Sequence, residues 1–154
     1  MNWFGKLQAQ VTFTGSARQC LWLAGSRREW ITTEALARNV DWFIERLSRD
    51  VLGRRQVRKG HLLLYVGVIE GDRVVDYNRM HVHLAIGGIP VGYSLGHIRQ
   101  RISDRWQSSR WGYNDLQATN LDDDPQSRWN RYMLKEFDPA QSERWITNVP
   151  YRQT

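Results

Sequence analysis

Hydrophobic and polar residues follow regular spacings along most of this chain, and changes of spacing predict where one element ends and the next begins. Residues 10–14 alternate β-branched or aromatic side chains with polar ones and stop at Gly15, which predicts a short strand. Between residues 33 and 51, apolar residues recur at spacings of four, three and four, as on one face of an α-helix. Residues 53–60 include four basic side chains and predict a charged loop.

Two apolar segments in the middle of the chain predict a pair of strands. Residues 61–70 are apolar at both alternating positions and stop at Gly71, which predicts a buried strand. Residues 80–86 predict a second strand, which Gly87 and Gly88 close. Only about ten residues separate the two segments, whereas a parallel crossover needs a dozen or more. We therefore expect the two strands to pair antiparallel.

The second half of the chain predicts two further helices and a strand. Ser94 is a suitable N-cap for a helix with a buried apolar stripe, formed by Leu95, Ile98, Ile102 and Trp106. Residues 116–121 predict a strand, and Asp124 with Pro125 begins a helix that extends to Phe137. The resulting order, β-α-β-β-α-β-α, predicts the α+β class. We expect a split β-α-β (ferredoxin/RRM-like) sandwich with an antiparallel sheet of about four to five strands and helices on one face.

Composition narrows the function classes. The 154 residues fit one domain, 1–154, and lack an apolar run long enough for a membrane helix, so we expect a soluble, cytoplasmic protein without a membrane partner. Cys20 is the only cysteine, which excludes an internal disulfide and a thiolate metal cluster. The formal net charge of +6 and the pI of about 9.9 predict a polyanionic partner, nucleic acid in the first place.

Two histidines supply the first candidate chemistry. Residues two apart on a strand point to the same side, so His81 and His83 share one face, and we expect that face to be open while the opposite face packs on helices. Two imidazoles with a carboxylate suit Mn²⁺ or Mg²⁺, whereas a third histidine would suit Zn²⁺. Glu70 ends the neighbouring strand and could add an oxygen, with Asp72 and Asp76 as alternatives. A pair of polar surface histidines is the simpler interpretation.

A tyrosine and a lysine supply the second candidate chemistry, a nucleophile with a cation beside it. Tyr132 and Lys135 lie one helical turn apart on the predicted helix 125–137. A phenol with a pKa of about 10 is a poor nucleophile at neutral pH unless a cation or base stabilises the phenolate. Lys135 could provide that cation, although a lysine at the edge of an amphipathic helix is common without such a role. Tyr113 and Tyr151 are other candidates, but neither has a lysine at helical spacing.

The order of these motifs resembles a known superfamily. The first strand 10–14, the apolar segment with His81 and His83, and then Tyr132 with Lys135 resemble the HUH endonucleases, over residues 10–137. Because the tyrosine follows the histidines, the chain looks like the single-tyrosine rolling-circle replication initiators. Small single-tyrosine transposases of the superfamily are similar in motif order and remain an alternative.

The resemblance implies a specific reaction. A divalent metal ion, Mn²⁺ or Mg²⁺, held by His81, His83 and Glu70 would polarise a phosphate of single-stranded DNA at a replication origin or hairpin. Tyr132 would attack the phosphorus, release a 3′-hydroxyl and stay joined to the 5′-phosphate, with help from Lys135. The partners implied are the origin DNA of a plasmid or phage and a helicase of the host or replicon.

Basic side chains give candidate phosphate contacts, and two other function classes stay open. We expect DNA contacts from two predicted helices, through Arg99, Arg101, Arg105, Arg128 and Arg131. The basic loop residues Arg54, Arg55, Arg58 and Lys59 are further candidates. A single-stranded nucleic-acid-binding module without catalysis would use the same surfaces. A metal hydrolase would instead activate water and form no covalent adduct.

Overall fold

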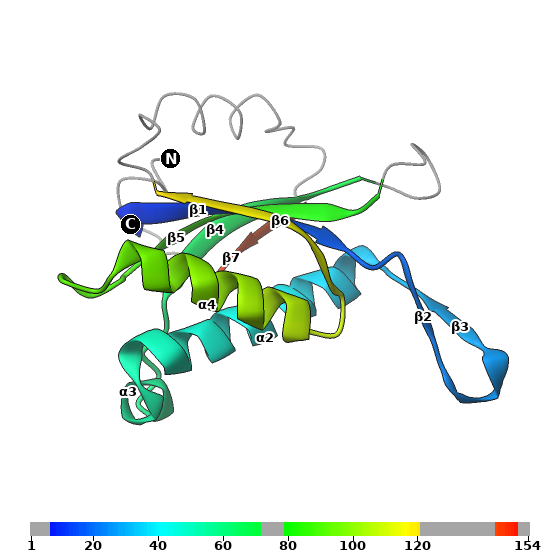
Figure 1. Cartoon of the computed structure of the whole chain (residues 1–154), viewed down its shortest axis with the longest axis horizontal. Coiled ribbons are helices and arrows are strands. Elements are labelled where there is room, and N and C mark those ends of the chain that lie inside the picture. The colour runs from blue at the N-terminus through cyan, green and yellow to red at the C-terminus, as the bar shows by residue number, and fades with distance from the viewer. Residues whose placement is uncertain (1–6, 72–78, 121–143, 151–154) are drawn as a thin grey trace.

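The structure is a computed structural model that describes residues 7–71, 79–120 and 144–150 (Figure 1). Strands and helices are mixed along the chain, with one short hairpin between the first strand and the first long helix. In chain order the elements are β1 (Ala9–Ala17), β2 (Cys20–Trp22), the 3-10 turn η1 (Ala24–Ser26), β3 (Arg28–Trp30), α2 (Thr33–Leu52), α3 (Arg54–Arg58), β4 (Leu64–Glu70), β5 (His81–Gly87), α4 (Leu95–Ser108), β6 (Gly112–Asn120) and β7 (Trp145–Thr147).

Five of the strands form one sheet in the order β6-β1-β5-β4-β7, and every pairing within it is antiparallel. The path β1-α2-β4-β5-α4-β6 is that of a split β-α-β sandwich, with β1 and β5 in the middle. The predicted fold class is therefore confirmed, including the antiparallel pairing of β4 with β5. β7 adds a fifth strand beside β4, which agrees with the predicted four to five strands, although the sequence did not indicate which residues form it.

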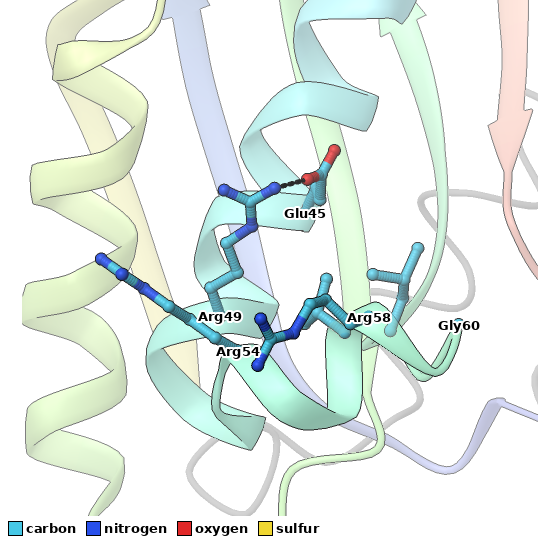
Figure 2. A pocket seen from close by; sticks show the side chains of 7 residues that line it. Glu45, Arg49, Arg54, Arg58 and Gly60 are labelled. Carbon is cyan, nitrogen blue, oxygen red and sulfur yellow. Dashed lines mark hydrogen bonds and ion pairs between the residues drawn. The ribbon is translucent and has the colours of Figure 1, made fainter.

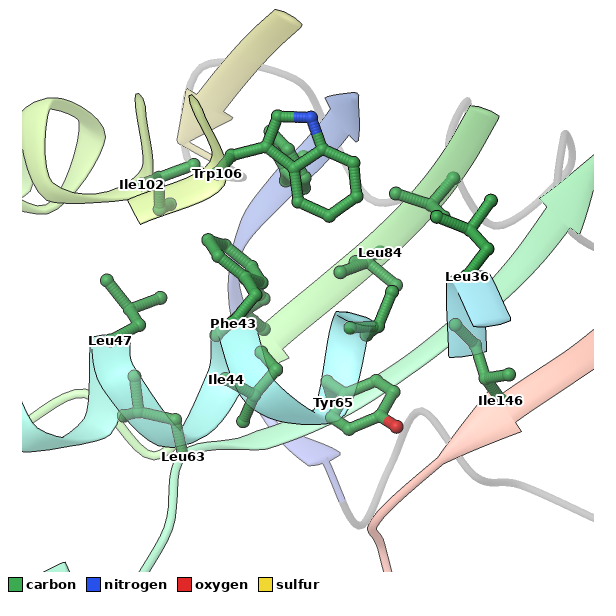
Figure 3. Packing of buried hydrophobic residues seen from close by; sticks show 14 of the residues in the cluster. Leu36, Phe43, Ile44, Leu47, Leu63, Tyr65, Leu84, Ile102, Trp106 and Ile146 are labelled. Carbon is green, nitrogen blue, oxygen red and sulfur yellow. The ribbon is translucent and has the colours of Figure 1, made fainter. Parts of the chain in front are cut away.

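Helices α2 and α4 cover one face of the sheet, and the main core lies between them and the strands (Figures 1 and 3). The face is apolar because alternate strand residues point towards the helices, as Phe13, Val82 and Leu84 do. From the helices, Phe43 and Trp106 meet Phe13 in a cluster of three rings with centroids 5.2–5.4 Å apart. The alternation of the strands thus decides which side of the sheet carries polar side chains.

Polar caps define the starts of both long helices. The Thr32 side chain accepts a hydrogen bond from the Ala35 amide at the start of α2. Ser94 caps α4 in the same way by accepting from the His97 amide, as the sequence predicts. At its other end α2 stops at Gly53, whose φ of 86° is rarely adopted by residues with a side chain. The helix predicted at 33–51 is therefore present as Thr33–Leu52.

Two local predictions need correction, and one hairpin was not predicted. Residues 54–58 form the short helix α3 and not a charged loop, and the carbonyls of Gln56 and Val57 accept hydrogen bonds from the Lys59 and Gly60 amides at its end. The strand predicted at 10–14 continues through Gly15 to Ala17, because β5 pairs with it as far as Ser16 and β6 as far as Ala17. The small and basic residues that follow it form the β2–β3 hairpin, which no alternating pattern predicted.

The face that carries the histidines is also less open than expected. At one end of it, Leu7 and Val149 pack on Val66 and Ala85 in a second, smaller apolar cluster. Chain segments from both ends of the sequence thus cover that part of the sheet, which strand periodicity does not reveal. The predicted helix 125–137 lies outside the described residues. Among those described, no helix is both long enough and apolar enough to cross a bilayer.

Candidate metal centre and basic surfaces

The register of β4 against β5 builds a three-residue cluster on the face opposite the helices. Glu70 lies directly across from His81, and Val68 lies across from His83, so the three polar side chains point the same way. The Glu70 Oε2 atom is 3.0 Å from His81 Nε2 and 3.2 Å from His83 Nε2. All three side chains are partly buried. The predicted pairing of both histidines with Glu70 is therefore present.

The donor atoms of this cluster fit a divalent cation. One ligand atom from each of Glu70, His81 and His83 lies within 4.8 Å of the other two. Two ligand atoms bound about 2.1 Å from one ion at a right angle lie about 3.0 Å apart, which is close to the Oε2–Nε2 distances. Two imidazole nitrogens and a carboxylate oxygen also suit a first-row divalent ion. The cluster could therefore hold a metal ion.

Outer hydrogen bonds orient both imidazoles for this role. His81 Nδ1 lies 2.9 Å from the backbone carbonyl of Arg79 and can only donate to it, which turns Nε2 towards Glu70. His83 Nδ1 lies 2.9 Å from the Thr14 hydroxyl on β1. Metal-binding histidines commonly use their second nitrogen in this way. Sequence reasoning missed Thr14, although its polar position in the alternation of β1 places it on the histidine face.

Glu70 changes the protonation of the cluster. Its hydrogen bond to His81 raises the pKa of that imidazole above its ordinary value, and this outweighs the opposing effect of burial. Glu70 can accept from a protonated Nε2 while Nδ1 donates to the Arg79 carbonyl. A proton on Nε2 occupies the position that a metal ion needs. Protons and metal ions should therefore compete for His81.

We expect Mn²⁺ to raise the Tm more at pH 8 than at pH 6. Without metal, the protonated His81 stabilises the fold fully below about pH 6.5, and this contribution is lost as the pH rises through its raised pKa. Stabilisation by the metal ion instead increases as the pH rises, because the ion can bind His81 only after the proton has left Nε2. Differential scanning fluorimetry with Mn²⁺ or EDTA across this pH range measures both effects.

Two variants control that measurement. His81→Ala should abolish the Mn²⁺-dependent shift at every pH, because one of the three ligands is gone. His61→Ala should keep it, since His61 is exposed and hydrogen-bonds to Gln56 at 2.8 Å. A Mn²⁺ shift that is the same in His81→Ala as in the unmodified protein would contradict the assignment of the site.

Several residues predicted for the site lie outside the described part of the chain. These are the alternative ligands Asp72 and Asp76, the catalytic candidates Tyr132 and Lys135, the alternative nucleophile Tyr151, and the predicted DNA contacts Arg128 and Arg131. Their positions relative to Glu70, His81 and His83 stay predictions.

Tyr113, the alternative nucleophile within the described residues, lies on β6. It shares its alternating position with Asp115, whose carboxylate accepts a hydrogen bond from Ser16 opposite His81. The Tyr113 ring is 39% exposed and has the Arg79 guanidinium 5.8 Å from its centroid. Tyr113 therefore lies towards the end of the sheet that carries the metal-ligand cluster.

The three arginines predicted on α4 do not have the same surroundings. Arg99 and Arg101 are exposed. Arg105 instead donates two hydrogen bonds to Asp50 of α2, at 2.6 and 2.8 Å, and this pairing raises its pKa. All three belong to the helix layer, whereas His81 and His83 point to the other face of the sheet. The structure therefore does not bring these arginines together with the metal-ligand cluster.

We expect replacement of Arg99 and Arg101 to change DNA binding and replacement of Arg105 to change stability. If the exposed pair contacts phosphates, the double alanine variant should lower the slope of log K against log salt by about 1.4 for single-stranded DNA. Arg105→Ala should instead cost about 1 kcal/mol, because it leaves Asp50 without its bidentate partner. Salt titrations of binding and urea unfolding measure the two effects. An unchanged salt slope in the double variant would contradict the contact.

A second concentration of positive charge lines a cavity of about 550 Å³ at the α2–α3 junction (Figure 2). Its charged lining consists of Arg49, Arg54 and Arg58 with a single carboxylate, Glu45, which pairs with Arg49. Arg54 and Arg58 were predicted as phosphate contacts. Their position shows that the basic segment after α2 forms a pocket wall, which is compatible with that role.

Comparison of this chain with family models, with curated proteins and with solved structures finds no match. The functional argument therefore rests on the residues and on their geometry.

Proposed function

We propose that this protein is a metal-dependent endonuclease that nicks and rejoins single-stranded DNA through a 5′-phosphotyrosine, as the single-tyrosine replication initiators of the HUH superfamily do. The observation that carries the proposal is the cluster of Glu70, His81 and His83 on one face of an antiparallel sheet. The motif order along the sequence and the net charge of +6 support it further.

The proposed reaction assigns a role to each group. Glu70, His81 and His83 would hold a divalent ion, Mn²⁺ or Mg²⁺, which when bound supplies Lewis-acid polarisation of the phosphate. The Tyr132 phenol loses its proton and its oxygen forms a bond to phosphorus, the bond from phosphorus to the 3′-oxygen breaks, and that oxygen takes up a proton and leaves as a hydroxyl, so no net proton is gained or lost. Lys135 lies one helical turn from Tyr132 in the predicted helix and stabilises the phenolate. Reversal by another 3′-hydroxyl rejoins the strand without ATP.

The outer partners of the histidines have a positioning role in this proposal. The Thr14 hydroxyl and the Arg79 carbonyl each engage Nδ1 of one imidazole. They fix the rings so that both Nε2 atoms converge on Glu70. Thr14→Val should therefore weaken Mn²⁺ binding by about 10-fold without removing a ligand. Isothermal titration with Mn²⁺ tests this, and unchanged affinity would contradict the positioning role.

The test of the proposal is a covalent adduct. The protein is incubated with single-stranded DNA pooled from the replicon that encodes it, with Mn²⁺ or with EDTA, and then denatured. We expect a protein–DNA adduct that requires the metal, is lost in His81→Ala and persists in His61→Ala. Cleavage without an adduct would favour a metal hydrolase. Binding of every fragment without cleavage or adduct would favour a nucleic-acid-binding module.

A further inference from the structure

The β2–β3 hairpin projects from the body of the protein (Figure 1). Its two strands pair Cys20 with Trp30, Leu21 with Glu29 and Trp22 with Arg28. Opposed residues of an antiparallel pair share a face, and successive residues alternate between faces. The hairpin therefore has one face with Cys20, Trp22, Arg28 and Trp30, and another with Leu21 and Glu29.

These two faces have different surroundings. Leu21 packs against the main core, and Glu29 forms an ion pair with Arg110 in the connection between α4 and β6. The side with Leu21 and Glu29 therefore holds the hairpin against the body. On the other face, Trp22 is 64% exposed and Trp30 is 42% exposed. The Arg28 guanidinium lies 4.4 Å from the Trp22 ring centroid and 6.0 Å from that of Trp30.

The base of the hairpin is tied to the end of the sheet that carries the metal-ligand cluster. Gln19 accepts a hydrogen bond from the Met80 amide at 3.0 Å, and its backbone carbonyl accepts one from Ile31 at 3.1 Å. Met80 directly precedes His81, and Ser16 pairs with His81. Trp22 lies six positions after Ser16, so the chain between them spans at most about 20 Å.

We infer that this exposed face, Trp22 with Arg28 and Trp30, is a stacking platform for bases of single-stranded DNA, at the end of the sheet that carries the metal-ligand cluster. The inference rests on the proposed function and adds where the substrate strand is held. Indole rings stack on any base, and arginines neutralise neighbouring phosphates. Arg28 supplies positive charge on this face and the neighbouring Arg27 is exposed, while Glu29 is paired with Arg110. This charge favours a polyanionic strand as the ligand.

The test uses binding without cleavage. Fluorescence anisotropy of a labelled oligothymidylate in EDTA reports affinity for the unmodified protein and for Trp22→Ala, Trp22→Phe and Trp42→Ala. Trp22→Ala should weaken binding about 10-fold, the loss expected for one stacked base, and Trp22→Phe should retain most of the affinity. Trp42 is the matched control, because it is 37% exposed and has Arg46 at 5.2 Å from its ring, but belongs to α2.

Several outcomes would overturn the inference. Equal affinity of Trp22→Ala and the unmodified protein would do so, as would an equal loss in Trp42→Ala. Binding of anionic phosphatidylserine vesicles through Trp22, without binding of the oligothymidylate, would indicate that the β2–β3 hairpin binds membranes instead. The adduct assay separates this inference from the proposed function. An adduct with affinity independent of Trp22 overturns the platform alone, whereas Trp22-dependent binding without an adduct supports the platform and contradicts catalysis.

Discussion

Tyr132→Phe should abolish the covalent protein–DNA adduct, a loss of at least about 10³-fold in rate, while single-stranded DNA binding stays near that of the unmodified protein. The phosphotyrosine bond needs the phenol oxygen, which phenylalanine lacks, whereas the ring itself is kept. Binding depends on phosphate and base contacts that this substitution leaves in place. Denaturing gels of the Mn²⁺ reaction and anisotropy in EDTA measure the two quantities on one preparation.

Tyr113→Phe is the matched control for this experiment. Tyr113 is an exposed tyrosine near the same end of the sheet as the metal-ligand cluster, and Arg79 lies over its ring. We expect its adduct yield to equal that of the unmodified protein. If the adduct instead persists in Tyr132→Phe and disappears in Tyr113→Phe, the nucleophile is misassigned although the nicking chemistry stands. Persistence of the adduct in both variants would contradict a nucleophile at either position.

Trp106→Ala should cost about 3–5 kcal/mol in the free energy of unfolding, the range measured for truncation of large buried side chains. Trp106 is fully buried and makes edge-to-face ring contacts with Phe13 and Phe43. Figure 3 shows Trp106 beside Phe43 in this core. The Trp106 indole N–H donates to the Ser16 carbonyl at 3.0 Å, so truncation also leaves that acceptor unpaired. Since a domain typically has a free energy of unfolding of about 5–15 kcal/mol, this variant should lose a large fraction of it.

Urea unfolding followed by circular dichroism tests this prediction, and Trp42→Ala again serves as the control. Trp42 is 37% exposed and Trp106 is fully buried, so removal of Trp42 should cost clearly less stability than removal of Trp106. A second variant, Gly15→Ala, probes the same packing from the opposite side. A methyl group there would come within 2.4 Å of the Phe13 ring and 2.8 Å of the Trp106 ring. Stability of Trp106→Ala equal to that of the control would contradict the assigned packing.

Much of the fold could be predicted because its elements have strong local periodicity. The apolar stripe of α4 and its Ser94 cap agree with the structure within a few residues. The β2–β3 hairpin and β7 could not be predicted from the sequence, for a physical reason. Each of their strands has only three residues, which is too short to establish an alternation, and their residues are placed by contacts with distant segments. One such contact is the ion pair between Glu29 and Arg110.

The candidate metal centre was likewise predictable in part from the sequence and in part only from the tertiary structure. The sequence by itself determined that His81 and His83 share a face, because residues two apart on a strand point to the same side. It also determined that Glu70 ends the preceding strand, because the apolar segment stops there before Gly71. Only the tertiary structure decided that Glu70 lies opposite His81 and that Thr14 reaches His83. These contacts depend on the register between strands, which turns and packing across the sheet set and local spacing does not encode.

Long-range contacts also explain why the basic residues of α4 have different surroundings. Composition and charge predicted a polyanionic partner, but helical spacing could not distinguish Arg105 from Arg99 and Arg101. Arg105 meets Asp50 because α2 and α4 pack side by side on the sheet, which is a long-range consequence of the fold. The sequence thus determined the element types, the net charge and which residues share a face of one strand or helix. The tertiary structure decided which of these faces meet, because residues far apart in the chain come into contact only when the whole sheet and its helices assemble.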